Sequence, residues 1–274
     1  GAHYDSVLDA PCADDNATSV AVALAAAETF AAHPLQRDVV VALFDSEEPP
    51  YFLSPAMGSK RFYEDHRAGT RFACALIMDP ISHDVELGFA PDGSLPREAE
   101  ERIRQLLFIT GAESGGHLPG AVESAAASVD GLHVVPTLNA YVGDMSDHHT
   151  FRLGRQPYLF LSCGQGRYYH HPLDRLDTPG WINFDKTHRV YRLVVELLRE
   201  VDGGLDSDGG DDAAATPASD MPDSIDTTKF EIRHMEAAFG PLLPMLLAKM
   251  GLTELKARED IDRIAAALRG TLVA

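Results

Sequence analysis

The sequence predicts an α/β fold, a three-layer αβα sandwich whose central sheet is mainly parallel. Three observations support this prediction: short apolar runs typical of strands buried on both faces, helical stretches that alternate with these runs, and 274 residues with 45% hydrophobic content. A chain of this length and composition can bury one sizeable core. Strands that alternate with helices are joined by crossovers, which place helices on both faces of a parallel sheet.

The elements of this fold follow one another along the chain. The first is an Ala-rich helix over residues 17–33, which begins just after the good capping residues Asp14, Asp15 and Asn16. The run "DVVVALF" predicts a strand buried on both faces over 38–44, and "FACALIMD" predicts another over 72–79. We further expect a helix over 97–111, strands over 131–138 and 157–162, and a long amphipathic helix over 183–201.

The last quarter of the chain, from residue 201 onward, begins with a stretch of different composition. Residues 201–226 contain eight Asp and no Lys or Arg, with Gly, Ala, Ser and Pro between them. Such a stretch buries too little apolar surface to offset chain entropy, so a disordered acidic linker is predicted over 201–228. The linker separates a main domain, 1–200, from a small helical appendage over 229–274, in which we recognise no chemistry.

Charge and cysteine content exclude several classes of protein. The formal net charge of −19 argues against nucleic-acid and anionic-membrane partners, since such surfaces need clustered Lys and Arg. The sequence has no apolar run of the length that a membrane span needs and no recognisable signal peptide. The three cysteines, Cys12, Cys74 and Cys163, are too few and too scattered for a disulfide framework or a thiolate metal site.

Histidines and carboxylates gather where the predicted strands end. Glu47 and Glu48 follow the strand over 38–44, Asp79 closes the strand over 72–79, and ligands of open α/β sheets bind at this edge. Each group alone has a plain structural explanation, as a solvated loop, a helix cap or a surface His pair. Their coincidence on one edge favours a site. The other polar residues that we expect there are His3, Asp5, Asp15, the segment "SDHHTF" from Ser146 to Phe151 and the segment "YYHHPLD" from Tyr168 to Asp174.

Histidine and carboxylate without cysteine are the ligands of a hydrolytic zinc site or a similar divalent site. Five such ligands, one of them a bridging carboxylate, would hold two ions roughly 3.5–4 Å apart, as in two-metal aminopeptidases.

The motifs, in order and at plausible spacing over residues 1 to about 200, resemble those of the M28 zinc peptidases, which include bacterial aminopeptidases and glutamate carboxypeptidases. They are "AHYDS", "ADDNATSVAV", "FDSEEPPYF" with "MGS", "LIMDPI", "SDHHTF" and "YHHPLD". The resemblance implies a zinc exopeptidase-like fold over 1–200. It also implies a peptide substrate and two zinc ions.

The resemblance also implies a role for each residue. One zinc would be bound by His3 and Asp79, the other by Glu48 and His170, with Asp15 as the bridge. Glu47 would be the general base that takes a proton from the zinc-activated water and returns it to the leaving amine. The free α-amino group of the substrate would bind at this cluster, which would make the protein an aminopeptidase.

Residues outside the ligand set are expected to support it. Asp5 would orient the imidazole of His3. Ser146 and Asp147 would lie behind the ligands and shape the site, and His148 would be structural or a hydrogen-bond partner. Aromatic residues near the metals, namely Phe52, Phe151 and Tyr168, are expected as pocket walls.

Two departures from the family pattern leave alternatives open. Cys12 stands where the family usually has Gly, and "EEPPYFLSPAMGS" is longer and richer in proline than the usual turn. The longer turn is similar to that of the glutaminyl cyclases, relatives that bind a single zinc and cyclise N-terminal Gln. A third hypothesis is a non-catalytic binding module of the same fold, although every candidate position is filled here.

The family places a buried strand directly before the residue that corresponds to His3. Such a strand would lie upstream of Gly1, so an N-terminally truncated domain is expected, and we predict that residues 1–274 alone are poorly stable.

Overall fold

The computed structural model describes residues 1–274 except 69–70, 88–92, 94, 208–224 and 273–274. Most of the predicted acidic linker therefore lies outside the described residues. Its first residues do not fit the prediction, because helix α7 (Phe184–Ser207) continues past residue 200. None of the described helices combines the length and the apolarity that crossing a membrane requires.

The described strands form a mainly parallel sheet. Strands β1 and β2 pair in parallel, and a second group has the order β3-β6-β4-β5, in which only β4 and β6 run antiparallel. The backbone of Gly1 joins the groups, since its nitrogen donates to the Leu76 carbonyl (2.6 Å) and its carbonyl accepts from the Met78 amide (3.1 Å). The strands are β1 (Ala2–His3), β2 (Leu43–Phe44), β3 (Ala75–Met78), β4 (Leu106–Thr110), β5 (His133–Thr137) and β6 (Tyr158–Ser162).

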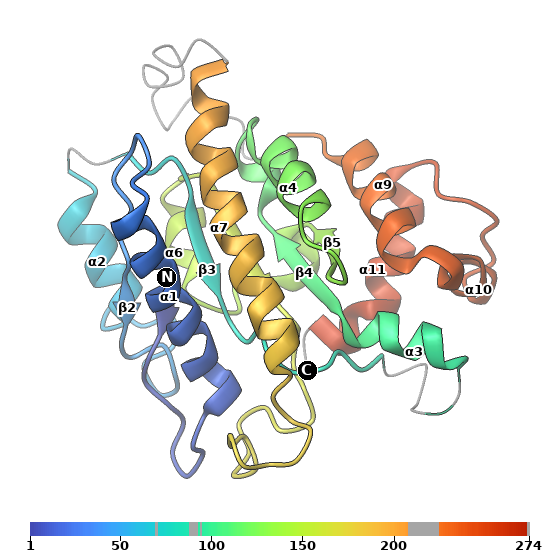
Figure 1. The fold of residues 1–274 in the computed structure, drawn as a ribbon, viewed down its shortest axis with the longest axis horizontal. Coiled ribbons are helices and arrows are strands. Elements are labelled where there is room, and N and C mark those ends of the chain that lie inside the picture. The colour runs from blue at the N-terminus through green and yellow to red at the C-terminus, as the bar shows by residue number, and fades with distance from the viewer. Residues whose placement is uncertain (69–70, 88–92, 94, 208–224, 273–274) are drawn as a thin grey trace.

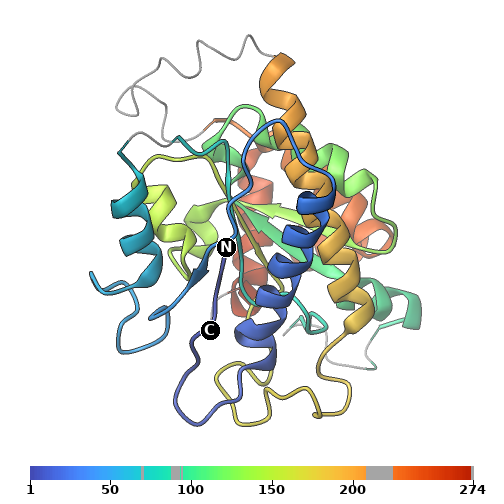
Figure 2. The same ribbon diagram turned by 60° about the vertical axis from the view of Figure 1, so that its left-hand side comes forward.

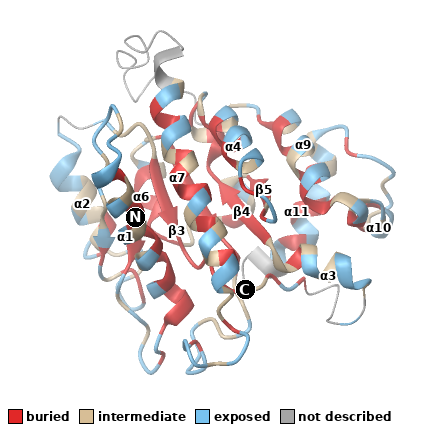
Figure 3. Cartoon of the chain, viewed as in Figure 1, coloured by how far each residue is buried: buried red, intermediate tan, exposed pale blue. Residues whose placement is uncertain are grey.

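Helices cover both faces of this sheet, which gives the predicted three layers. On one face α7 lies between α1 (Thr18–Ala32) and α4 (Leu118–Ala127), as Figures 1 and 2 both show. On the other face α6 (His148–Leu153) packs on β3 and β6 and contacts α2 (Gly58–His66). The strands between the layers are buried, and the helices turn their buried side toward them (Figure 3).

The C-terminal helices pack against the far edge of the sheet. Helix α9 (Thr228–Phe239) lies along β5, and η3 (Gly240–Leu242), α10 (Leu243–Lys249) and α11 (Arg258–Leu272) complete this region (Figure 1). The buried side chains of α9 belong to the same apolar cluster as those of the sheet. The boundary between main domain and appendage stays a prediction, but the two share one core.

The predicted helix over 97–111 is wrong in its second half. Helix α3 (Arg97–Arg104) ends there, and "LLFIT" forms the buried strand β4. The charged part of this stretch has helical periodicity, whereas Leu106–Thr110 is a continuous apolar run with β-branched and aromatic residues, which is typical of a strand buried on both faces.

The prediction of a strand buried on both faces over 38–44 is also wrong. Only Leu43–Phe44 pairs as β2, at the edge of the sheet, and the Val40 side chain is 62% exposed. The other predicted elements are confirmed: the strands over 72–79, 131–138 and 157–162 correspond to β3, β5 and β6, and the helices over 17–33 and 183–201 to α1 and α7.

Candidate metal centre

The candidate ligands lie where the sequence places them, at the carboxyl ends of parallel strands. His3 ends β1, Asp79 directly follows β3, and Glu48 comes shortly after β2. Asp15 lies in η1 (Ala13–Ala17), the turn that leads into α1, and His170 lies in the loop after β6. Because β1, β2, β3 and β6 are mutually parallel, their ends meet at one edge of the sheet.

The side chains converge in two sets that share Asp15. Ligand atoms of His3, Asp15 and Asp79 lie within 4.8 Å of one another, and so do those of Asp15, Glu48 and His170. One oxygen of Asp15, Oδ1, is 3.2 Å from His3 Nε2, and the other, Oδ2, is 3.3 Å from His170 Nε2. The sets are completed by His3 Nε2 to Asp79 Oδ1 at 3.5 Å and His170 Nε2 to Glu48 Oε2 at 3.1 Å.

Burial makes this cluster electrostatically unusual. The side chains of Asp15, Glu47, Glu48 and Asp79 are only 3% to 9% exposed, although four carboxylates lie together. Burial raises the pKa of Glu48 and of Asp79. Burial also opposes ionisation of Asp15, but the contacts with His170 and His3 outweigh it and lower the Asp15 pKa to about 2. The contacts with Asp15 and Glu48 raise the pKa of His170 to about 10.

These residues fit divalent cations. His3 Nε2, Asp15 Oδ2, Glu48 Oε1 and Asp79 Oδ1 are buried and form no well-shaped hydrogen bond with the described residues. Buried polar atoms normally have partners, and unpartnered atoms that converge on one point are arranged as a bound cation would require. Imidazole with carboxylate is a donor set suited to zinc, and cations would also offset the buried negative charge.

Glu47 occupies a different position from its neighbour Glu48. Its Oε2 lies 3.9 Å from His3 Nε2, and burial together with the Asp79 carboxylate raises the Glu47 pKa to about 10. Ser46, just before it, has φ 54, in the left-handed region that costs a non-glycine residue free energy. His170 also has a positive φ, of 55. Such strained residues gather at functional sites, where the surrounding structure holds them.

Asp5 supports the site in two ways, only one of which was predicted. Its carboxylate lies 3.4 Å from His3 Nδ1, consistent with the predicted role in orienting that ring. The same carboxylate accepts hydrogen bonds from the backbone amides of Glu47 (3.2 Å) and Glu48 (3.1 Å). Asp5 therefore fixes the turn after β2 relative to β1.

A second group, which the sequence did not predict, holds the backbone of Asp15. Asp174 accepts hydrogen bonds from the backbone amides of Asp14 (2.8 Å) and Asp15 (3.1 Å) and from the indole of Trp181 (2.7 Å). Asp14 in turn contacts His83 Nδ1 at 2.6 Å, and the His83 ring stacks on Trp181. The only signal in the sequence was the position of Asp174 in the "YYHHPLD" segment, which we interpreted as a ligand segment.

The "SDHHTF" segment lies next to the candidate ligands, since the Ser146 side chain contacts the Asp79 carboxylate. Ser146, Asp147 and His148 are fully buried, and burial raises the Asp147 pKa to about 7. His148 Nε2 donates to the Gly143 carbonyl (3.0 Å), and its ring stacks on Phe160.

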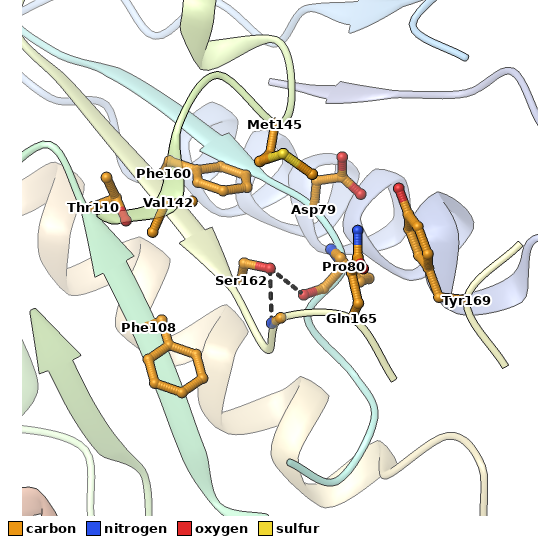
Figure 4. A pocket seen from close by; sticks show the side chains of 11 residues that line it. Asp79, Pro80, Phe108, Thr110, Val142, Met145, Phe160, Ser162, Gln165 and Tyr169 are labelled. Carbon is orange, nitrogen blue, oxygen red and sulfur yellow. Dashed lines mark hydrogen bonds between the residues drawn. The ribbon is translucent and has the colours of Figure 1, made fainter. Parts of the chain in front are cut away.

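A small cavity of about 30 Å³ opens beside Asp79. Figure 4 shows the Asp79 carboxyl group and the Tyr169 side chain at one end of the cavity, and Phe108 and Thr110 at the other. The Tyr169 ring stacks on His170, with ring centroids 3.9 Å apart. Among the tyrosines of the "YYHHPLD" segment, Tyr169 lines the cavity and the predicted Tyr168 does not; Tyr168 contacts Trp181 instead. The predicted wall residue Phe151 lies instead in the core against Phe72 and Tyr63, and Phe52 does not line this cavity.

Cys12 has a backbone conformation that favours glycine, the residue usual at this position in the family. Its φ of 53 and ψ of 52 are left-handed, the region that favours glycine. The side chain is buried, and burial raises the pKa of its thiol to about 12. The thiol is therefore protonated at neutral pH and unsuited to bind metal.

Comparison with solved structures shows the same fold. LapB from Legionella pneumophila aligns with a TM-score of 0.56 at 17% identity, over 74% of this chain and 50% of its own. BSAP, a zinc aminopeptidase from Bacillus subtilis, aligns at 0.53 and 19% identity, over 73% and 44%. The LapA aminopeptidase of Legionella pneumophila aligns at 0.53 and 15% identity, over 74% and 50%. The chain thus spans about half the length of these proteins.

The search of curated protein sequences gave no significant match. The sequence model of Peptidase family M28, by contrast, matches residues 1–197, well over half of the chain and the whole region that carries the candidate ligands. This chain therefore belongs to peptidase family M28.

Proposed function

We propose that the protein is a zinc metallopeptidase, an aminopeptidase that removes residues from peptides with a free N-terminus. The observation that carries the proposal is the pair of ligand sets with Asp15 between them. One oxygen of Asp15 faces His3 and the other faces His170. A carboxylate shared in this way is the arrangement that a two-ion hydrolytic site needs. Family membership and the solved zinc aminopeptidases of the same fold support the same proposal.

In this proposal His3 and Asp79 hold one zinc ion, Glu48 and His170 hold the other, and Asp15 bridges them. When bound, the ions lower the pKa of water and polarise the carbonyl group of the scissile bond. The protein supplies the rest. Asp5 fixes the His3 ring and the turn that carries the two glutamates, and Asp174 fixes the backbone on which Asp15 lies.

Glu47 is the general base of the proposal. It is buried and adjacent to both ligand sets, but it belongs to neither of the two sets that share Asp15. Burial and the Asp79 carboxylate raise its pKa, and cations next to it would favour the ionised form that a base requires. Glu47 takes a proton from the attacking water and delivers it to the departing amine nitrogen.

The preference for a free N-terminus rests on charge. The cluster contains buried carboxylates that accept charge-assisted hydrogen bonds, and the α-ammonium group of a peptide is a positively charged donor. An N-acetylated substrate lacks this group. The site would then lose one partner for its buried carboxylates, which costs binding free energy.

The proposal is tested with zinc-loaded protein and three substrates: alanyl 4-nitroanilide, its N-acetyl derivative and a peptide with N-terminal Gln. We expect hydrolysis of the free amine and a rate lower by about 10²-fold or more for the acetylated form. Equal rates would contradict the aminopeptidase assignment. Cyclisation of the Gln peptide without anilide hydrolysis would indicate a cyclase, and zinc binding with neither reaction would indicate a binding module.

A further inference from the structure

One wall of the cavity beside Asp79 is formed by the short segment Val142–Met145. Val142 and Met145 both line the cavity, with Met145 beside Asp79 (Figure 4), and Val142 is the last residue of α5 (Asn139–Val142). The cavity has room for about two water molecules, so its size is decided by small displacements of its walls. The position of α5 therefore bears on which side chain fits.

Helix α5 cannot fix its own position. A helix of four residues gains little from internal hydrogen bonds, and its placement depends on what it contacts. Two side chains of the main domain contact it: Glu113 Oε1 accepts from the Asn139 amide (2.8 Å), and His148 Nε2 lies 3.0 Å from the Gly143 carbonyl and 3.2 Å from Asn139 Oδ1. A third comes from the C-terminal region, where the Tyr141 hydroxyl donates to Asp262 of α11.

The third contact is part of a network among the C-terminal helices. Arg258 of α11 forms two hydrogen bonds with Glu231 of α9, at 2.7 and 2.8 Å. Arg258 also lies beside the Tyr141 hydroxyl, and its contacts with Glu231 and Tyr141 raise the pKa of the Arg258 guanidinium. Glu231 is almost fully buried, and Thr227 donates to it as well. Helices α9 and α11 thus form a fixed support that reaches α5 through Tyr141.

We propose that the C-terminal helices set the substrate preference of the site, with Tyr141 as a positioning residue that holds the Val142–Met145 wall through Asp262. This proposal rests on the proposed aminopeptidase function. Without the Tyr141 contact, the wall keeps its contacts with Glu113 and His148 but moves away from Asp79 more easily, so the cavity admits larger side chains. Neither Tyr141 nor Asp262 is a candidate ligand. The loss of their contact should therefore change KM for larger substrates more than kcat.

The test compares two variants with the wild type: Tyr141→Phe, which keeps the ring and removes only the hydroxyl, and Asp262→Ala, which removes the acceptor. The measurement is the ratio of kcat/KM for leucyl over alanyl 4-nitroanilide. We expect both variants to raise this ratio by about tenfold, mainly through KM. A change of this size is typical when a pocket gains or loses room for one methylene group. Arg233→Gln is the matched control, because Arg233 joins α9 to Glu123 of α4 (2.9 Å) far from the cavity.

The control should leave the ratio unchanged. An unchanged ratio in folded Tyr141→Phe protein overturns the proposal, as does an equal change in Arg233→Gln. Hydrogen exchange of residues 139–147 adds a readout that needs no activity: exchange should be faster in Tyr141→Phe and unchanged in Arg233→Gln. If the wild type cleaves neither substrate, the proposed function fails, and this exchange alone decides whether the contact holds the wall; equal exchange overturns it.

Discussion

Tyr169 is the residue whose chemical role the structure adds to the site. Its ring stacks on His170 and lines the cavity with Asp79, and burial with the neighbouring carboxylates raises its pKa. The hydroxyl therefore stays protonated and can donate a hydrogen bond to negative charge that develops on a substrate carbonyl oxygen.

We predict that Tyr169→Phe lowers kcat by about 10²-fold, the usual cost of one lost donor to a transition state, and changes KM little. The measurement is steady-state kinetics on an aminoacyl anilide. Tyr168→Phe is the matched control, since Tyr168 packs against Trp181 and should keep its kcat. A kcat for Tyr169→Phe within twofold of the wild type would show that the hydroxyl takes no part.

At the scale of elements, the loop after β6 fixes the backbone of another candidate segment as well as carrying the candidate ligand His170. Asp174 accepts three hydrogen bonds, two of them from the backbone amides of Asp14 and Asp15. We predict that Asp174→Asn weakens zinc binding by about 10-fold to 100-fold, because residues that orient ligands have effects of this size. The measurement is a zinc titration. Asp177→Asn, an exposed change in the same loop, should bind zinc like the wild type.

Helix α6 begins with a histidine that makes stability depend on pH. Burial lowers the pKa of His148 to about 4, below the value near 6.5 of an unfolded histidine. As the pH falls from 6.5 to 4, the unfolded chain takes up a proton that folded His148 does not, so the free energy of unfolding decreases.

The expected loss at His148 is on the order of 3 kcal/mol, since each pKa unit corresponds to about 1.4 kcal/mol. Urea unfolding between pH 4 and 6.5 measures it, with His148→Gln as the comparison because Gln can still donate to the Gly143 carbonyl. The wild type should lose more stability over this range than the variant. Parallel losses in the two proteins would contradict the assignment.

The sequence was sufficient to predict the elements whose whole stretch has one pattern. These are the helices α1 and α7 and the continuous apolar strands β3 and β6. The prediction failed where a helix and a strand follow each other within one stretch, as α3 and β4 do. The residues of "RQLLFIT" fit the helical pattern of α3, and only the structure shows that the apolar run is buried on both faces of a sheet. The prediction also failed for β2, since a strand's place at a sheet edge depends on pairing, which no local pattern encodes.

The candidate ligands were predicted better than their supports. His3, Asp15, Glu48, Asp79 and His170 stand in motifs whose spacing is specific, and the structure brings them together. Asp174, Tyr169 and Tyr141 act through contacts between segments distant in sequence, and only the fold shows which segments meet.

At the scale of the whole molecule, the site concentrates negative charge in a protein that already carries a net charge of −19. Cations that bind the folded state alone stabilise it by mass action. We predict that EDTA lowers Tm by several degrees and that added zinc restores it. Differential scanning calorimetry checks this, and a Tm that EDTA leaves unchanged would argue against a metal centre. The Tm of Glu48→Gln, which lacks one ligand, should respond less.

In our proposal, two adjacent glutamates at one strand end have different roles: Glu48 binds metal and Glu47 is the general base. The most direct measurement is zinc content and anilide turnover of Glu47→Gln and Glu48→Gln, side by side with the wild type. We predict that Glu47→Gln keeps wild-type zinc content but loses at least about 10³-fold in kcat, within the range for a lost general base. Glu48→Gln should lose zinc and activity together. Wild-type turnover by zinc-loaded Glu47→Gln would contradict the account.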